Sequence, residues 1–364
     1  MFLMLVVFAV PEIALASVDT AESVCVMNTV TGNVVYSKNE FTKKPMASTT
    51  KIMTLIVALE NSKPDDIVTV SRDAAYQEGS SAYTKPNAKI TMLDLCYGLM
   101  LNSGNDASVA IAEHISGDIE KFAELMNKKA KEIGATETHF VNPNGLHDDK
   151  HYTTALDLAK ITCYGLKNEQ FRNIVSCKMY TSRMTMPDGE IVEVEYINHN
   201  RLLKDQENCI GVKTGFTKTA GRCLVSAVND NGAQYVIVTL DDSDDWQTHK
   251  DLYNKIIGDA QEKKIIRKGV CIKHADDCAL VAKEEFSVYT NGEKNNYEII
   301  QNLPDEIDFP INKGEKIGYL EIRANNKQIG IVDVVAKTDF VPRKTTVIKN
   351  CFLFTLTNLL RNIL

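Results

Sequence analysis

PMASTTKIMTLIVALE, residues 45–60, places a serine and a lysine three positions apart at the start of an apolar segment. From Ser48 onward the segment is apolar nearly all round, which predicts a buried helix. The spacing puts Ser48 and Lys51 on one face of that helix. The free N–H groups at the helix start point toward the serine, where they can stabilise a developing oxyanion. The segment therefore predicts a nucleophilic serine at the start of a core helix, although S-x-x-K alone recurs by chance.

Two further triplets fit the same chemistry. Ser103-Gly104-Asn105 lies in a predicted loop between helices, where a hydroxyl and an amide can reach into a cleft. Lys213-Thr214-Gly215 lies at the end of a predicted strand. There a cation and a hydroxyl can bind a carboxylate, and glycine allows close backbone approach. Ser37-Lys38-Asn39 also matches S-x-N, but it precedes the nucleophile at a hairpin edge and is predicted to be a solvated turn.

The order S-x-x-K, S-x-N, K-T-G is the motif order of penicillin-binding proteins and serine β-lactamases. Longer stretches extend the similarity, and over nearly its full length the chain resembles the low-molecular-mass penicillin-binding proteins, the serine-type D-alanyl-D-alanine carboxypeptidases. The stretches are PMASTTKIMTLIVALE (45–60), LMLNSGNDASVAIAEHISG (99–117), FVNPNGLHDDKHYTTALDLA (140–159), NHNRLL (198–203) and GVKTGFTKTAGRCLVSA (211–227).

The resemblance implies catalytic roles for three residues and a binding role for Asn105. Ser48 attacks the carbonyl between the last two D-alanines, and Lys51 is the base that accepts its proton. An ordinary lysine has a pKa of ~10.4, which burial, the helix N-terminus and nearby Lys213 are expected to lower. Ser103 relays the proton to the leaving amine, and Asn105 holds Lys51 or the substrate amide.

The resemblance also implies the residues that bind the substrate's end. Lys213 and Thr214 bind the terminal carboxylate beside Gly215, and the backbone N–H groups of Ser48 and Phe216 form the oxyanion hole. Some family members have histidine where this chain has Phe216. That difference leaves the backbone donor intact and leaves the substrate preference open.

Several other polar residues are assigned no catalytic part. His151 is predicted to have a hydrogen-bonding role near the cleft rather than that of a base. Glu137 misses the E-x-x-L-N pattern of class A β-lactamases and is predicted to be an exposed loop residue. The chain has 9 cysteines without a CxxC pair, an odd count that leaves at least one thiol unpaired, and no disulfide pairing is assigned. No H-x-x-H pair occurs, and neither metal nor cofactor is expected.

The periodicity predicts an α+β catalytic domain over residues 17–262, of the serine β-lactamase and penicillin-binding transpeptidase type, with an antiparallel sheet and a helical subdomain. A hairpin is predicted over 24–36, helices within 92–132 and 154–166, strands from 179 onward and a closing helix over 244–257. Short β-like runs at 279–289, 297–301, 317–323 and 327–336 predict a β-sandwich-like domain over residues 263–342.

The two ends predict export and membrane association. Residues 1–16 combine a short apolar run with Ala14-Leu15-Ala16, which indicates a signal peptide. Residues 343–364 form an amphipathic pattern with basic side chains, which indicates a helix on the membrane surface, at the outer face of the cytoplasmic membrane. A helix packed on the β domain is the alternative. The formal net charge of -7 and the lack of basic or phosphate-binding motifs argue against a nucleic-acid partner.

Together these features predict a carboxypeptidase that removes the terminal D-alanine from peptidoglycan stem pentapeptides through an acyl-enzyme on Ser48. Its expected partners are the D-Ala-D-Ala terminus, β-lactams as covalent inhibitors, and the membrane surface. A β-lactamase and a non-catalytic penicillin-sensing or wall-binding protein are the alternatives. Endopeptidase action on cross-links uses the same chemistry and is not separated from carboxypeptidase action by these motifs.

Overall fold

The structure, a computed structural model, describes residues 20–230, 232–257, 260–275, 278–290, 295–307 and 310–339. The predicted signal peptide and the predicted C-terminal helix lie outside the described residues. Within the described ranges, no helix is long and apolar enough to cross a membrane.

A five-stranded antiparallel sheet forms the centre of the N-terminal part, in the order β2-β1-β9-β8-β7. The predicted hairpin is the β1–β2 pair, and β1 joins the start of this part to its end by pairing with β9. The strands are β1 (Ala21–Asn28), β2 (Val34–Lys38), β7 (Cys209–Thr217), β8 (Gly221–Asp230) and β9 (Ala233–Asp242).

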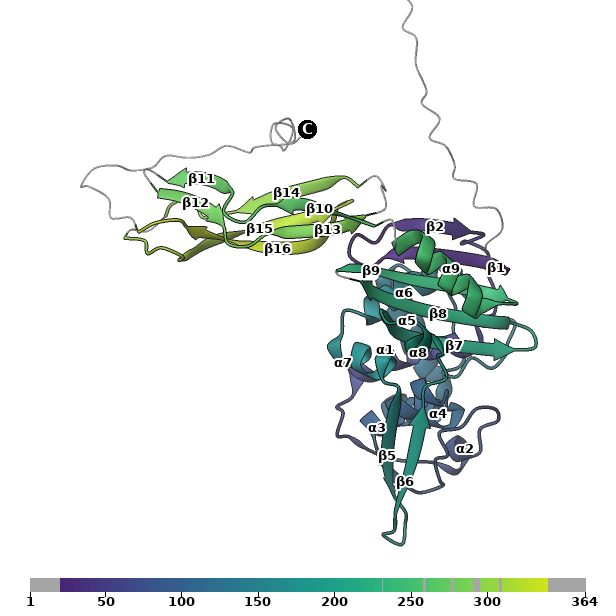
Figure 1. The fold of residues 1–364 in the computed structure, drawn as a ribbon. Helices are drawn as coiled ribbons and strands as arrows, with labels where there is room; N and C mark the ends of the chain where they lie inside the picture. The colour runs from purple at the N-terminus through teal and green to yellow at the C-terminus, as the bar shows by residue number, and fades with distance from the viewer. Residues whose placement is uncertain are drawn as a thin grey trace, which may run out of the picture.

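Helices cover both faces of this sheet (Figure 1). Because side chains alternate along a strand, Val236 and Val238 of β9 join the core with the helical layer, whereas Tyr235 and Ile237 pack with α9 (Asp245–Ile257). The helical layer is centred on α1 (Lys51–Asn61), which is buried along most of its length, as its apolar sequence predicts.

Capped helices surround α1. Thr91, Asp118, Thr154 and Asn168 each cap a helix N-terminus by accepting a backbone N–H, which satisfies groups that the helix itself leaves unpaired. The predicted helical region 92–132 is confirmed as three helices. The helices are α2 (Arg72–Ala75), α3 (Met92–Leu101), α4 (Asn105–Ser116), α5 (Ile119–Ile133), α6 (Ala155–Gly165), α7 (Glu169–Ser176) and α8 (Leu202–Asp205).

A four-stranded antiparallel sheet lies beside these helices, in the order β3-β4-β5-β6. Its long hairpin, β5–β6, extends to the lower end of the molecule in Figure 1. The strands are β3 (Ile67–Thr69), β4 (Lys89–Thr91), β5 (Met179–Thr185) and β6 (Ile191–Ile197).

The C-terminal part is all β, as predicted. A five-stranded sheet, β11-β12-β16-β15-β14, and the β10–β13 pair share one apolar core. The predicted run 279–289 is two strands, and β10 crosses the predicted boundary at residue 262. The strands are β10 (Gln261–Ile266), β11 (Cys271–Ala275), β12 (Cys278–Ala282), β13 (Phe286–Thr290), β14 (Tyr297–Asn302), β15 (Lys316–Ala324) and β16 (Lys327–Ala336).

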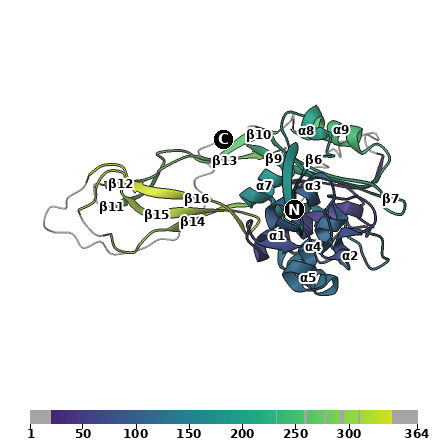
Figure 2. The same cartoon turned by 90° about the horizontal axis from the view of Figure 1, so that it is seen from below.

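The two parts meet at the turn between β1 and β2. Asn33 Nδ2 donates to Asn295 Oδ1 over 2.5 Å, and Asn325 Nδ2 donates to Asn33 Oδ1 over 2.7 Å. Asn28 Nδ2 donates to the Tyr289 carbonyl over 2.8 Å. Tyr289 of β13 also packs against the apolar cluster between β9 and α9. Figures 1 and 2 show the C-terminal part extending away from this end of the N-terminal part.

Candidate active site

Ser48 lies in a single 3-10 turn, η1 (Ala47–Thr50), that leads directly into α1. The helix predicted from Ser48 therefore begins with a tighter turn. Ala47 has a φ of 48°, a conformation that is uncommon outside glycine, and Gly145 with a φ of 87° packs against its carbonyl. This close approach holds the serine at the surface of the helical core, where its side chain is half-buried.

Lys51 is fully buried one turn after Ser48, and its ammonium group has three acceptors. Lys51 Nζ donates to Ser48 Oγ over 3.0 Å, to Asn105 Oδ1 over 2.7 Å and to the Asn144 carbonyl over 2.7 Å. An ammonium group has three N–H donors, so all of them are used. The lysine is thereby fixed with one N–H directed at the serine oxygen.

The surroundings of Lys51 hold its pKa well below the usual range for lysine. Burial is the main cause, the charge of Lys213 acts in the same direction, and Asp106 opposes both. Removing an ammonium from water favours its neutral form, as does a neighbouring cation. A neutral Lys51 can accept a proton from Ser48.

The K-T-G triplet lies inside β7, which continues to Thr217, whereas the sequence predicts that the strand ends at the triplet. The pairing of β7 with β8 continues through Lys213↔Val225 and Gly215↔Cys223, so backbone hydrogen bonds hold the whole motif. Lys213 is buried, and burial lowers its pKa to about 7. Its ammonium donates to the Thr214 carbonyl over 2.9 Å.

Gly215 brings β7 against the nucleophile. A Cβ atom built on Gly215 would lie 3.0 Å from the Ser48 nitrogen and 3.1 Å from the Thr49 nitrogen. Only glycine allows two backbones to approach so closely without displacement. The strand that carries Phe216, a residue that is 66% exposed, therefore lies beside the backbone nitrogen of Ser48.

The structure links some of the predicted site residues by direct contacts. Ser48, Lys51 and Asn105 are joined by hydrogen bonds, and Gly215 contacts the nucleophile's backbone. Ser103 is buried with a φ of 59°, and its hydroxyl makes no hydrogen bond to any described residue. It comes one residue before the N-cap of α4, whose first residue is Asn105.

The Asn144 carbonyl is a partner of Lys51 that sequence reasoning missed. Asn142 Oδ1 accepts from the Gly145 N–H over 2.7 Å, and Asn144 Oδ1 accepts from the Leu146 N–H over 3.0 Å. These local bonds form the tight turn that the sequence Asn142-Pro143-Asn144-Gly145 predicts. A turn signal does not tell where its carbonyl groups point, so the contact with Lys51 follows only from the tertiary structure.

His151 lies behind the site rather than at the nucleophile. Its Nδ1 accepts from the Val141 N–H over 3.1 Å, so the ring proton is on Nε2, which donates to Thr50 Oγ1 over 2.8 Å. Burial lowers the pKa of His151 to about 4. A neutral histidine that bonds η1 to the 139–152 loop agrees with the predicted hydrogen-bonding role.

Glu137 is an exposed loop residue, as predicted. Its side chain is 53% exposed and forms an ion pair with Lys43 over 3.1 Å. This pairing directs the carboxylate to a surface lysine.

Glu137→Gln is expected to change the lifetime of a penicilloyl enzyme less than about tenfold, or under ~1.4 kcal/mol of barrier, because the side chain has no part in activating water. Release of bound label followed by mass spectrometry measures that lifetime, and Glu132→Gln, another exposed glutamate paired with lysine, is the matched control. Rapid penicillin turnover that disappears in Glu137→Gln alone would support a β-lactamase instead.

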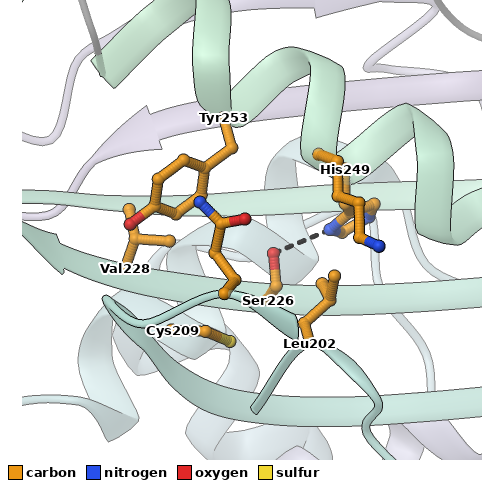
Figure 3. A pocket seen from close by; sticks show the side chains of 8 residues that line it. Leu202, Cys209, Ser226, Val228, His249 and Tyr253 are labelled. Carbon is orange, nitrogen blue, oxygen red and sulfur yellow. Dashed lines mark hydrogen bonds between the residues drawn. The ribbon is translucent and has the colours of Figure 1, made fainter. Parts of the chain in front are cut away.

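A small hollow lies on the face of the sheet that α9 covers (Figure 3). Its lining includes Ser226 and His249, whose Oγ and Nδ1 atoms lie 2.7 Å apart, and Thr239 Oγ1 lies 3.1 Å from His249 Nε2. Burial lowers the pKa of His249 to about 3. Ser226 and His249 are both fully buried, so their contact is a hydrogen bond within the packing between α9 and the sheet.

Three features identify the class of enzyme. The serine is half-buried, the amine of a buried lysine with a lowered pKa lies at the serine hydroxyl, and a glycine-containing strand packs against the serine nitrogen. Together with an antiparallel sheet covered by helices, they are the parts of an active-site serine enzyme of the penicillin-binding and serine β-lactamase type.

Comparison with known proteins identifies the family. Residues 12–244 match the peptidase S11 family, described as D-alanyl-D-alanine carboxypeptidase, and residues 260–341 match the C-terminal domain of penicillin-binding protein 5. The chain belongs to the D-alanyl-D-alanine carboxypeptidases of the low-molecular-mass penicillin-binding proteins, and it is a serine-type carboxypeptidase with an α+β catalytic fold followed by an all-β domain.

Individual relatives agree with this assignment. D-alanyl-D-alanine carboxypeptidase DacF of Bacillus subtilis is 30% identical over 343 residues, which are 88% of this chain and 85% of DacF. DacD of Escherichia coli is 29% identical over 85% of this chain and 84% of its own. The crystal structure of penicillin-binding protein 5 from Haemophilus influenzae has a TM-score of 0.64 at 26% identity and covers 88% of this chain and 97% of that chain.

Proposed function

We propose that the chain hydrolyses the bond between the last two D-alanines of peptidoglycan stem pentapeptides, with Ser48 as nucleophile and Lys51 as base. The observation that carries the proposal is the 3.0 Å contact between Lys51 Nζ and Ser48 Oγ in a buried setting that favours neutral lysine. Other members of the family act on D-alanyl-D-alanine, as their names state, and this agrees with the substrate.

In the first half-reaction Lys51 takes the hydroxyl proton of Ser48 while Oγ bonds to the carbonyl carbon. The backbone N–H groups of Ser48 and Phe216 receive the oxyanion, and the close approach of Gly215, the residue before Phe216, to the Ser48 nitrogen supports this assignment. The C–N bond then breaks, and the proton passes from Lys51 through Ser103 to the leaving nitrogen. D-alanine departs, and Ser48 retains the acyl group as an ester.

In the second half-reaction water attacks the ester carbonyl and Lys51 takes a proton from that water. The ester C–O bond then breaks, Lys51 passes this proton to Ser48 Oγ, and the shortened peptide leaves. Asn105 holds Lys51 in place through the 2.7 Å contact of its Oδ1 atom. Lys213 and Thr214 bind the terminal carboxylate of the substrate as a cation and a hydroxyl on one strand. β-Lactams acylate the same serine as covalent inhibitors.

Release of free D-alanine from a stem pentapeptide tests the proposal. We expect release of one D-alanine per peptide and a long-lived adduct with penicillin. Fast penicillin turnover without D-alanine release would favour a β-lactamase, and an adduct without any turnover would favour a penicillin-sensing protein. Cleavage of cross-linked dimers in a parallel assay measures the endopeptidase activity.

The proposed location is outside the cytoplasmic membrane, at its outer face. Residues 1–16 have the pattern of a signal peptide that export would remove, residues 17–262 would form the catalytic domain, and residues 263–342 the β domain. Residues 343–364 would rest on the membrane surface as an amphipathic helix, in which apolar side chains recur on one face and the basic residues carry no acidic neighbour.

Deletion of residues 343–364 is expected to release the mature protein from anionic vesicles, because it removes both the apolar face and the basic side chains. Sedimentation with vesicles of phosphatidylglycerol measures binding, and unchanged penicillin labelling of the shortened protein is the control for folding. Failure of the full-length protein to sediment would mean that the tail packs on the β domain instead.

A further inference from the structure

Residues 78–84 connect α2 to β4 and wrap around the start of α4. The Glu78 carbonyl accepts from Asn105 Nδ2 over 2.6 Å, and the Ser80 carbonyl accepts from the Asn105 N–H over 2.7 Å. Because the side-chain nitrogen Nδ2 of Asn105 is hydrogen-bonded to this segment, the Oδ1 atom faces Lys51 Nζ at 2.7 Å. The segment thus determines which way the Asn105 side chain is turned.

Asp106 anchors the second half of this segment. Its carboxylate is buried and accepts from Ser81 Oγ over 2.8 Å, the Ala82 N–H over 2.8 Å, and the N–H and Oγ1 of Thr84, each over 3.0 Å. An ionised carboxylate only accepts hydrogen bonds, so it matches all four donors. Hydrogen bonds to a charged acceptor are about twice as strong as neutral ones.

Tight packing holds the same segment in place. Ala82 is fully buried, and a Cβ atom added to Gly98 or to Gly104 would lie 2.7 Å from the Ala82 Cβ. Tyr196 Oη donates to the Ala82 carbonyl over 3.1 Å. The glycine of S-G-N is therefore required for the close approach of residues 81–84 to α4.

We propose that Asp106 is a positioning residue for acylation, which ties residues 78–84 to α4 and thereby turns Asn105 toward Lys51. The proposal rests on the proposed roles of Ser48 and Lys51. Asp106 also acts through its charge. The groups that influence Lys51 are Lys213 on β7, which lowers its pKa, and Asp106 on α4, which raises it. His151, from the loop behind η1, is neutral.

Asp106→Asn keeps the size of the side chain but loses the charge and places an amide N–H₂ among donors. We expect the second-order rate of penicillin labelling to fall by about tenfold to 100-fold, because a misplaced catalytic group slows reaction to that extent. We also expect the acidic limb of the rate–pH profile to move to lower pH. Lys51 without a nearby carboxylate loses its proton more readily, and labelling needs neutral Lys51.

Three further variants separate the loss of anchoring from the loss of the negative charge. Asp94→Asn removes another buried carboxylate, at the cap of α3, and is expected to leave the limb in place. Ser81→Ala with Thr84→Val weakens the anchoring but keeps the charge, so we expect a several-fold slower rate with an unmoved limb. Lys213→Met removes the opposing cation and is expected to move the limb to higher pH.

The proposal is overturned if Asp106→Asn labels within about twofold of the unmodified protein, or if its rate falls while the limb stays in place. If Asp106→Asn does not fold, a wild-type rate in the Ser81→Ala and Thr84→Val double variant overturns it. Absence of labelling at Ser48 in the unmodified protein would contradict the proposed function instead, so the two failures are distinguishable.

Discussion

Replacing Ser48 by alanine is expected to abolish covalent labelling by penicillin and the release of D-alanine together, because the atom that forms the acyl bond is lost. Only one of the three acceptors of Lys51 disappears, and Asn105 and Asn144 still hold it, so the fold is expected to persist. Intact-protein mass spectrometry after exposure to penicillin measures the adduct.

Ser37→Ala is the matched control for this variant. Ser37 belongs to the second S-x-N match of the chain and lies on β2, outside the hydrogen-bonded group around Lys51. Its substitution is expected to leave labelling unchanged. An adduct that persists on Ser48→Ala would show that another residue is the nucleophile and would overturn the assignment of the site.

Replacing Lys51 by methionine is expected to slow acylation by about 10² to 10⁴, the range that a positioned general base contributes. Methionine fills a similar volume but cannot accept the serine proton. The buried acceptors on Asn105 and Asn144 lose their donor in this variant, while the cost of burying a charge also disappears. A thermal unfolding curve measured alongside the labelling rate separates loss of the base from loss of the fold.

Lys129→Met is the control for the lysine substitution. Lys129 lies on α5 and is bonded to Glu60 and Glu132 over 2.8 Å each, away from the nucleophile. It is expected to label at the normal rate. If Lys51→Met acylates within about tenfold of the unmodified protein, the base is another group.

Regular elements were predictable where the local signals were long. The helices around residues 92–132 and 155–165 have caps and apolar faces within one stretch of chain, and the β1–β2 hairpin has a turn signal between two β-rich runs. Short elements such as β3 and α8 were not predicted, because three or four residues contain too little periodicity. The charged start of β10 was interpreted as the boundary between the two domains, whereas backbone pairing with β13 makes it part of a strand.

For the site, the sequence determined by itself which residues supply the chemistry, because nucleophile, base and carboxylate-binding groups depend on residue type and on short spacings along a helix or strand. The residues identified in this way include Ser48, Lys51, Asn105 and Gly215. In the structure, hydrogen bonds link Lys51 to Ser48 and Asn105, and Gly215 packs against the Ser48 backbone.

Only the tertiary structure decided what surrounds those residues. The Asn144 carbonyl and the Asp106 anchor come from segments that lie far from Lys51 along the chain, and no local pattern records their approach. The burial of Lys51 also depends on segments that are distant along the chain. A lysine has a lowered pKa only when other elements exclude water and bring Lys213 close, so the property that makes Lys51 a base arises from packing rather than from the S-x-x-K motif.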